Sequence, residues 1–487
     1  MNSDIVLKED QQIAIDSMKA FVKDDCSRVF ILKGYAGTGK TTLMRFFIEH
    51  LETIKKHYIL LASTGRAAKI LSNLTHTDAQ TIHSLIYKLE DLNKDLSEVD
   101  EEPDGQLYLS FKPTSINDNL PGQTIYIVDE SSMISDTDNE LIVQAQFGSG
   151  RLLKELLDYD KRPESKFIFI GDPCQLPPID STGSPALSSS YISRNFNLNC
   201  KESQLSEIIR QGNDNAIITA SQDIRDSWER APDTKSWYGE RLVWGKLNFS
   251  IGKDIHLYEN TKELISKYTE TIKRDGYNQA TMICRSNNKC YSISIEIRKR
   301  LEFNGAQLHK GDLLLVIQNN LISGLMNGDM VEVTEVDSHT ELVAGLTFRK
   351  ISVKELFSGC CYSQLLIEDI INQRILNLSP SQQKALFWDF IKRMKRRGIK
   401  QKDKLRFQKA MCEDPYLNAL RCVFGYAITC HKSQGGEWKD VFIYFPRNIT
   451  ANPTKSTYQW IYTAITRATE RLHIVNDFFI NSVIDKI

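Results

Sequence analysis

The chain has 487 residues, 41% of them hydrophobic and 25% charged, which excludes a single small module, a disordered chain and a collagen-like repeat. Lys and Arg number 61 and Asp and Glu 62, and the resulting net charge of −1 excludes a passive, strongly basic nucleic-acid coat protein. No apolar run approaches the roughly 18 residues that a membrane span needs, and ten irregularly spaced cysteines without a CxxC pair predict reduced thiols in a cytoplasmic protein.

The first motif along the chain is GYAGTGKT at residues 34–41, which matches GxxxxGK[ST]. It follows the apolar run VFILK and precedes LMRFFIEHL, whose apolar residues recur at helical spacing, so we expect the motif between a strand and a helix. The glycines allow backbone N–H groups to surround phosphate oxygens at a helix N-terminus. Lys40 would then reach the β and γ phosphates, and the Thr41 hydroxyl would bind Mg²⁺.

Further short apolar runs begin at Tyr58, Thr124, Lys166 and Asp440. Together with the run at Val29, they predict buried parallel strands in α/β layers. Residues 90–104 contain eight acidic side chains and one lysine, which is typical of a solvated loop. The following segment GQLYLSF alternates like a short strand before a proline.

Two of the predicted strands end in candidate catalytic groups. TIYIVDE ends in Asp129 and Glu130, at the carboxyl end of a strand, where open α/β sheets present their ligands. Asp129 is suited to holding Mg²⁺, and Glu130 to polarising an attacking water. In the later GDPCQLPP, Gln175 could sense a γ-phosphate or orient that water. Arg210 in LSEIIRQ and Arg467 in TAITRA are candidates for stabilising the charge that develops in phosphoryl transfer.

The segments HKGDLLLVIQNN and MNGDMVEVTEV alternate around an Asn-Gly-Asp turn, which predicts a small β module inserted within about residues 300–420. A helix is expected next, with Ser379 as N-cap, Pro380 in the first turn, Gln382 completing a capping box and Gly398 as terminator. Residues 392–409 at its end hold ten basic side chains and one acidic one. A solvated helix end and a nucleic-acid contact both stay open as interpretations.

In their order and wording, these motifs resemble those of the superfamily 1B helicases of the RecD/Dda type. The resemblance covers most of the chain and is carried by nine blocks. They are LKEDQQIA (motif Q), GYAGTGKTT (I), ASTGRAAKIL (Ia), TIHSLIY (Ib), VDESSM (II), GDPCQLPPI (III), LSEIIRQ (IV), AITCHKSQGGEW (V) and YTAITRA (VI).

The resemblance implies an α/β fold with two RecA-like P-loop NTPase domains, a small hairpin insertion in the first domain and a β-rich, SH3-like insertion in the second. We expect the first domain (1A) at residues 1–84 and 121–197, with its pin hairpin (1B) at 85–120. The second domain (2A) would comprise 198–300 and 421–487, and its insertion (2B), including the basic helix, would comprise 301–420.

The same resemblance implies ATP and Mg²⁺ as cofactors bound in the cleft between the two domains. Gln11 lies at the centre of the adenine-reading Q motif, and Arg210 and Arg467 become arginine fingers that couple domain closure to hydrolysis. The implied catalytic residues are Lys40, Glu130, Gln175, Arg210 and Arg467. The implied ATP contacts are Gln11, Gly34, Gly37, Thr38, Gly39, Lys40, Thr41, Thr42, Gly436 and Glu437, with Thr41 and Asp129 as the metal ligands.

For nucleic acid, the resemblance implies a face that holds backbone phosphates without reading the base sequence. The residues placed along it are Ser63, Thr64, His83, Thr429, His431, Lys432 and Ser433. Tyr108 or Phe111 in the pin would stack on a base, although packing within the hairpin is the alternative.

The function implied is an ATP-dependent DNA helicase that moves 5′ to 3′ on single-stranded DNA and parts duplex junctions. An RNA helicase of the same superfamily is the first alternative, and a nucleotide-dependent switch or assembly ATPase without translocation is the second. We expect a cytoplasmic, monomeric, stand-alone motor without a membrane contact, in which insertion 2B is the place for a protein partner.

Overall fold

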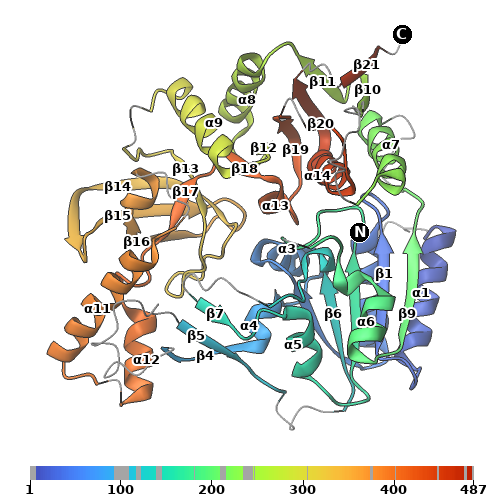
Figure 1. Cartoon of the computed structure of the whole chain (residues 1–487), viewed down its shortest axis with the longest axis horizontal. Helices are drawn as coiled ribbons and strands as arrows, with labels where there is room; N and C mark the ends of the chain where they lie inside the picture. The colour runs from blue at the N-terminus through green and yellow to red at the C-terminus, as the bar shows by residue number, and fades with distance from the viewer. Residues whose placement is uncertain are drawn as a thin grey trace, which may run out of the picture.

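The computed structural model describes residues 7–92, 109–116, 122–138, 145–179, 181–208, 215–233, 245, 247–303, 305, 307–372, 377–400, 402–446, 449–475 and 480–484. Two parallel sheets flanked by helices form the body of the molecule, and an antiparallel β module and a helical hairpin extend from one side (Figure 1). In the described part of the chain, no helix combines the length and the apolar character that a membrane crossing requires.

The first domain is built on a six-stranded sheet in which all neighbouring strands are parallel. The strand order is β3-β2-β6-β8-β1-β9, so the chain crosses over the sheet between strands. The strands are β1 (Val29–Gly34), β2 (His57–Ala62), β3 (Ala79–Thr81), β6 (Thr124–Asp129), β8 (Lys166–Gly171) and β9 (Cys200–Leu205). The predicted parallel strands that begin near Val29, Tyr58, Thr124 and Lys166 are therefore confirmed.

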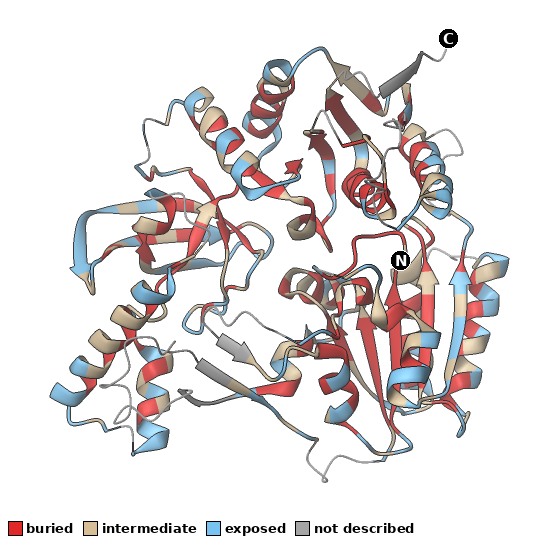
Figure 2. Cartoon of the chain, viewed as in Figure 1, coloured by how far each residue is buried: buried red, intermediate tan, exposed pale blue. Residues whose placement is uncertain are grey.

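Alternation along β1 explains why both faces of this sheet are covered. Phe30 and Leu32 pack on one face and Val29 and Ile31 on the other, because successive strand residues point to opposite sides. One face is covered by α1 (Glu9–Val22), α2 (Lys40–Thr53) and α3 (Gly65–Thr75), and the other by α4 (Ile82–Ile86), α5 (Leu152–Tyr159) and α6 (Ser189–Phe196). Figure 2 shows the resulting buried layer through the strands.

The second domain has a five-stranded parallel sheet of order β11-β20-β19-β12-β18. Its strands are β11 (Ile255–Tyr258), β12 (Ala280–Cys284), β18 (Ala427–Thr429), β19 (Trp438–Ile443) and β20 (Ala468–Val475). Its helices are α7 (Ala216–Arg230), α8 (Thr261–Asp275), α9 (Asn287–Arg300), α13 (Cys430–Ser433) and α14 (Lys455–Ile465), and a separate parallel pair joins β10 (Leu247–Ile251) to β21 (Ile480–Ile484). The predicted strand from Asp440 is β19.

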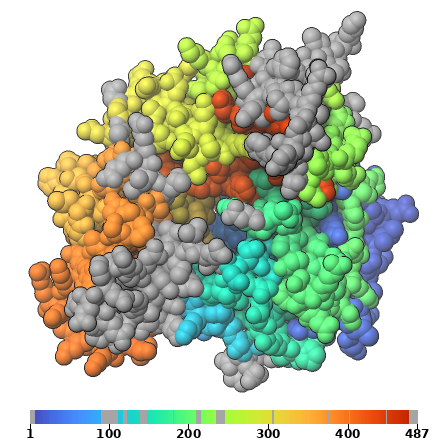
Figure 3. Space-filling model, viewed as in Figure 1, coloured from blue at the N-terminus to red at the C-terminus, as the bar shows by residue number. Residues whose placement is uncertain are grey.

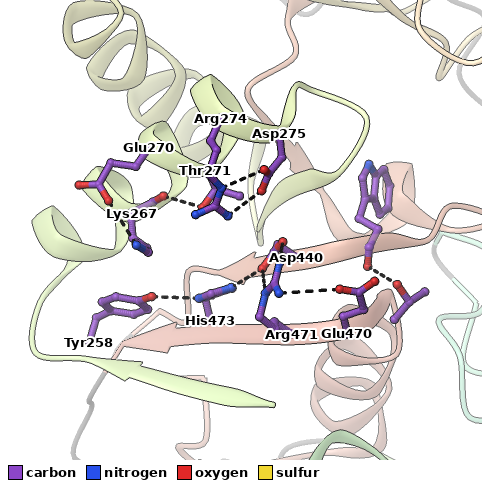
Figure 4. A network of polar contacts seen from close by, with 12 residues as sticks. Tyr258, Lys267, Glu270, Thr271, Arg274, Asp275, Asp440, Glu470, Arg471 and His473 are labelled. Carbon is purple, nitrogen blue, oxygen red and sulfur yellow. Dashed lines mark hydrogen bonds and ion pairs between the residues drawn. The ribbon is translucent and has the colours of Figure 1, made fainter. Parts of the chain in front are cut away.

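A buried carboxylate fastens β19 to β20 in this domain (Figure 4). Asp440, 2% exposed, accepts hydrogen bonds of 2.6 Å from both Nε and Nη2 of Arg471 and lies 2.8 Å from His473 Nε2. Burial alone would raise the pKa of Asp440, but these hydrogen bonds outweigh burial and hold that pKa well below its usual range. His473 Nδ1 lies 3.0 Å from the Tyr258 hydroxyl, so a neutral imidazole that donates from Nε2 satisfies both contacts.

We expect Asp440→Asn to lower the free energy of unfolding by about 2 to 3 kcal/mol at neutral pH, because the amide cannot pair with Arg471 as a carboxylate does. Burial also lowers the pKa of His473, so the unfolded chain binds a proton more readily than the folded one. The stability from His473 is therefore complete above about pH 6.5 and declines as the pH falls below it. Urea unfolding of both proteins from pH 5 to 8 measures both effects. Lys439→Gln, at an exposed neighbouring position, should stay within about 0.5 kcal/mol of the unaltered chain.

The β module lies between α9 and β18, as expected, and is an antiparallel sheet of order β16-β15-β14-β13-β17. Its strands are β13 (Leu313–Val316), β14 (Met330–Val343), β15 (Leu346–Glu355), β16 (Cys361–Ile367) and β17 (Cys422–Phe424). Three helices lie between β16 and β17 in the chain: α10 (Glu368–Asn372), α11 (Pro380–Arg396) and α12 (Lys404–Glu413). The predicted start of α11 is confirmed, because Ser379 and Gln382 form the capping box.

Three strands extend the sheets of the domains beyond the residue ranges that were expected for those domains from the sequence. β9 pairs with β1, so the first sheet continues past residue 197 to Leu205. β17 pairs with β13, so the β module continues past residue 420. The hairpin of β4 (Tyr87–Leu92) and β5 (Leu109–Pro113) gains a third strand, β7 (Ala145–Phe147), from outside the range 85–120. In each case a strand distant in sequence completes a sheet edge.

Candidate functional site

The phosphate loop joins β1 to α2, as predicted. Gly37 and Gly39 have φ values of 79° and 78°, which only glycine adopts readily, and Gly39 is the N-cap of α2. The Lys40 ammonium donates to the carbonyls of Gly34 at 2.8 Å and Tyr35 at 3.0 Å. Those carbonyls hold the lysine over the loop, where a phosphate oxygen could replace them.

A cavity of about 880 Å³ opens above this loop, between the two domains and the β module. Its lining contains most of the predicted nucleotide-site residues of the first domain, together with residues from motifs V and VI of the second. The predicted residues that line it are Gly37, Gly39, Lys40, Thr41, Thr42, Asp129, Glu130, Gln175, Glu437 and Arg467. Gly34, Thr38 and Gly436 are hydrogen-bonded to residues of the site. The Gly34 carbonyl accepts from Lys40, the Thr38 hydroxyl donates to the Tyr35 carbonyl, and the Gly436 carbonyl accepts from Arg467.

Asp129 and Glu130 form a half-buried carboxylate pair at the end of β6, in the lining of the cavity. The Glu130 backbone N–H donates to Asp129 Oδ1 at 2.9 Å, and Glu130 has the uncommon left-handed φ of 50°. Burial raises the pKa of both carboxyl groups, and the neighbouring charge of Asp129 helps to raise the pKa of Glu130 to about 7. A carboxyl group with a pKa near neutrality is suited to accepting a proton during turnover.

Among the described residues, no cluster of three or more His, Cys, Asp and Glu side chains is arranged to hold a metal ion. The protein donors beside the phosphate loop are the Thr41 hydroxyl and the Asp129 carboxylate, both in the lining of the cavity. This small set of oxygen donors fits Mg²⁺, which usually takes its other ligands from water and substrate phosphates.

Gln175 lies on a loop that the second domain holds in place. Its side-chain Oε1 is buried and has no hydrogen-bond partner among the described residues, so the amide is available to a ligand in the cavity. Gln459 of α14 donates to the Gln175 carbonyl at 3.2 Å, and Thr463 accepts from the Leu176 backbone N–H at 2.9 Å. Sequence reasoning missed both of these supporting residues.

Tyr462, the first residue of motif VI, links the same loop to the phosphate loop. Its hydroxyl donates to the buried Asp172 carboxylate at 2.8 Å and accepts from the Ala36 backbone N–H at 2.9 Å. Gln434 of motif V adds a 3.0 Å bond to the Leu176 carbonyl. The quoted motifs contain these residues, but no feature of the sequence distinguished them from core positions.

Arg467 brings a buried guanidinium from the second domain to the cavity. It is 4% exposed and is oriented by the Thr463 carbonyl at 3.0 Å, the Gly436 carbonyl at 3.3 Å and the Thr466 hydroxyl at 3.2 Å. Its positive charge acts to lower the pKa of Glu130 and so opposes the effect of burial on that carboxyl group. Arg210, the other predicted arginine finger, lies outside the described residues.

Two of the residues assigned to nucleic acid in the first domain pack partly against aromatic neighbours. His83 lies between Tyr87 and Phe147, with ring centroids 5.4 and 5.3 Å away, and burial lowers its pKa to about 4. Phe111 stacks on Phe147 with ring centroids 4.5 Å apart, a contact of the kind expected for packing within the hairpin. Tyr108, the other aromatic residue of the pin assignment, lies outside the described residues.

The remaining assignments differ in how accessible their polar atoms are. Ser63 Oγ is buried without a described partner, whereas Thr64 Oγ1 caps α3 by accepting from Ala67 N–H at 3.2 Å. Ser433 is fully buried and donates to the Cys430 carbonyl, so its hydroxyl is unavailable to a ligand. Of the other three, Thr429 and Lys432 line a second cavity of about 170 Å³, and burial lowers the pKa values of His431 and Lys432.

Comparison with known proteins identifies the family. Residues 6–240 match the model of an AAA domain, and residues 424–475 match that of a UvrD-like helicase C-terminal domain. The ATP-dependent DNA helicase dda of enterobacteria phage T4 is 31% identical over 349 residues, which cover 68% of this chain and 68% of that protein. The chain belongs to the superfamily 1B helicases of the RecD/Dda type.

Other similar proteins are more distant or longer. An uncharacterized protein of Methanocaldococcus jannaschii, MJ1519, is 25% identical over 477 residues, and the match covers 92% of this chain but only 36% of that protein. The Bacteroides Pif1 helicase, solved in complex with ADP-AlF3 and single-stranded DNA, is 16% identical with a TM-score of 0.47, covering 98% of this chain and 94% of that one.

Gln11, the central residue of the family's Q motif, is bound to the protein itself. It is 2% exposed, donates from Nε2 to the Thr38 carbonyl at 3.1 Å and accepts from the Lys8 backbone N–H at 3.1 Å. Gln11 does not appear in the described lining of the large cavity. In this structure Gln11 therefore stabilises the phosphate loop through its hydrogen bond to the Thr38 carbonyl.

A cation–π contact crosses the cleft between motifs Ia and V of this superfamily 1B chain. The Arg66 guanidinium at the start of α3 lies 4.3 Å from the ring centroid of Trp438 in β19, and both line the cavity. Gly436 makes the contact possible, because a Cβ there would lie 2.6 Å from Trp438 and 2.8 Å from Arg66. Sequence reasoning did not single out either member of this pair.

Proposed function

We propose that this chain is an ATP- and Mg²⁺-dependent DNA helicase that moves 5′ to 3′ on single-stranded DNA and separates the duplex ahead. The observation that carries the proposal is one cavity with a phosphate loop and a carboxylate pair on one side and Arg467 on the other. A relative of the same family bears the name of an ATP-dependent DNA helicase. Because both halves of the site belong to one chain, we propose a monomer as the working form.

In the proposed reaction, Lys40 and the backbone N–H groups of the loop bind the β and γ phosphates. Glu130 accepts a proton from the water that attacks the γ-phosphorus, and Gln175 orients that water. Thr41 and Asp129 would hold Mg²⁺, which would neutralise negative charge on the phosphates. Arg467 stabilises the transition state only when the second domain is closed, so closure and hydrolysis are coupled.

Steady-state ATP hydrolysis without nucleic acid, with single-stranded DNA and with single-stranded RNA tests this proposal at low salt, where phosphate contacts are strongest. We expect strong stimulation by DNA and none with Lys40→Ala, which controls for contaminating ATPases. Stimulation by DNA then justifies unwinding assays on 5′-tailed and 3′-tailed duplexes. Equal stimulation by RNA would favour an RNA helicase, and a rate indifferent to both would favour a switch ATPase.

Removal of the Arg66–Trp438 pair should weaken closure. A cation–π contact contributes about 0.5 to 2 kcal/mol, so Trp438→Leu should shift the balance between closed and open forms by roughly 2- to 30-fold. We expect a higher KM for ATP, measured from DNA-stimulated hydrolysis, together with a lower melting temperature, because Trp438 is 3% exposed and belongs to the core. Arg45→Gln removes a guanidinium that lies 5.8 Å from the ring of its neighbour Phe46, away from the cavity lining. A KM for Trp438→Leu no different from that of Arg45→Gln would contradict the prediction.

A further inference from the structure

The helical hairpin of α11 and α12 is a rigid projection with a small core of its own. Phe387, Phe390 and Met394 of α11 pack against Phe407 and Met411 of α12. Leu386 joins the hairpin to the core beneath β15 and β16. In Figure 3 the hairpin, in orange, forms the lower left edge of the molecule. Side chains on its outer face are therefore carried on a fixed support.

One basic residue of this hairpin serves its fold. Arg393 pairs with Asp389 at 2.6 Å and with the buried Asp414, and it also lies over the Tyr416 ring at 4.8 Å. The nine other cations of residues 392–409 behave differently, because their side chains are exposed (Figure 2). These are Lys392, Lys395, Arg396, Arg397, Lys400, Lys402, Lys404, Arg406 and Lys409, and together we call them the basic face.

The basic face has little internal compensation. Arg406 and Lys409 lie 3.7 and 3.9 Å from exposed acidic neighbours, distances at which surface pairs contribute little. Lys392, Lys395, Arg396, Arg397, Lys400 and Lys402 form no ion pair with a described residue. Like charges one helical turn apart repel each other, so this concentration of cations costs stability unless an anion approaches.

Helix dipoles account for only part of the pattern. Cations at the end of α11 are favourable, because a helix C-terminus carries partial negative charge. Lys402, however, directly precedes Asp403, the N-cap of α12, and Lys404 and Arg406 lie in the first turn of α12, where the partial charge is positive and cations are unfavourable. The cations cluster at the tip where the two helices meet, whichever helix end they occupy. Stabilisation of the two helices by their dipoles therefore does not explain why cations lie at the start of α12 as well as at the end of α11.

We propose that the basic face binds the phosphate backbone of double-stranded DNA ahead of the junction, an inference that rests on the proposed helicase function. A duplex presents closely spaced phosphates along a rigid rod, which matches an array of cations on a rigid support. Single strands are usually held by exposed aromatic side chains that stack on bases. In this hairpin Phe387, Phe390 and Phe407 are buried in its core and Trp388 packs partly against that core, so charge predominates over aromatic stacking surface on the basic face.

The test compares binding of a blunt duplex by the full chain and by the quadruple variant Lys395→Gln, Arg396→Gln, Lys400→Gln and Lys402→Gln. We expect the variant to bind at least about tenfold more weakly in low salt. The slope of log affinity against log salt should become shallower by roughly 0.9 for each phosphate that the variant no longer neutralises. A matched control removes four exposed lysines elsewhere, Lys56, Lys253, Lys262 and Lys299, and should leave the slope unchanged.

Two further measurements separate the possible failures. The charge-preserving variant Lys395→Arg, Arg396→Lys, Lys400→Arg and Lys402→Arg should bind duplex like the unaltered chain, whereas a folding defect would weaken both variants. ATP hydrolysis stimulated by single-stranded DNA should be equal in all four proteins, and its absence from the unaltered chain would contradict the helicase proposal instead. Unchanged duplex affinity and salt slope in the quadruple Gln variant would overturn the inference and leave an acidic protein as the partner to test.

Discussion

Glu130→Gln should bind ATP nearly as tightly as the unaltered chain and hydrolyse it about 100- to 10,000-fold more slowly, the range typical of losing a general base. The amide keeps the size of the carboxyl group and can still form hydrogen bonds, but it cannot accept the proton of the attacking water. The neighbouring Asp129 keeps its hydrogen bond from the backbone N–H of residue 130, so the metal-binding group stays in position.

Nucleotide affinity measured with a fluorescent ATP analogue and single-turnover hydrolysis separate the two effects. Glu49→Gln, an exposed position on α2, is the matched control and should leave both unchanged. Normal single-turnover hydrolysis by Glu130→Gln would show that another group takes the proton.

Arg467→Ala should lower kcat for DNA-stimulated hydrolysis by about 1,000-fold or more, because arginine fingers contribute 10³ to 10⁵ in rate. Arg467→Lys should recover only a small part of this activity, since an ammonium cannot reproduce the forked contacts of the guanidinium. Three protein oxygens orient this side chain, so its position is fixed before nucleotide arrives.

ATP affinity and melting temperature report on the structural role of Arg467, whereas kcat reports on its catalytic role. ATP affinity and melting temperature should change little in Arg467→Lys, while kcat falls. The conservative variant of a neighbouring, partly exposed arginine, Arg471→Lys, should retain kcat, because that residue pairs with Asp440 away from the cavity. A parallel fall in kcat for both variants would indicate general disturbance of β20 instead of a missing finger.

The parts of the fold that could be predicted are those encoded in short, continuous patterns. The apolar runs of β1, β6 and β8 are buried on both faces, so composition alone identifies them. The phosphate loop and the start of α11 depend on glycine, proline and capping residues at fixed spacing. These signals act locally and need no knowledge of distant segments.

The missed features depend on distant partners. β9 has the sequence CKESQL and lies at a sheet edge with mostly solvent-facing side chains, so it lacks the apolar run that marks a central strand. Gln459, Tyr462 and Thr463 act on a loop more than 280 residues away along the chain. The hydrogen bonds of Gln11 with the backbone of Lys8 and Thr38 could likewise not be predicted from the motif that contains it. Only the folded chain determines such pairings.

The contacts of α14 with the loop at Gln175 have a consequence for hydration. The Leu176 N–H and the carbonyls of Gln175 and Leu176 are satisfied by side chains of the opposite domain, at positions from which water is excluded. Separating the domains would leave these groups unpaired unless water entered to replace each partner. If the proposed cycle opens the cleft, each opening is also an uptake of water, and we expect solutes excluded from the protein surface, such as sucrose, to favour the closed, drier form.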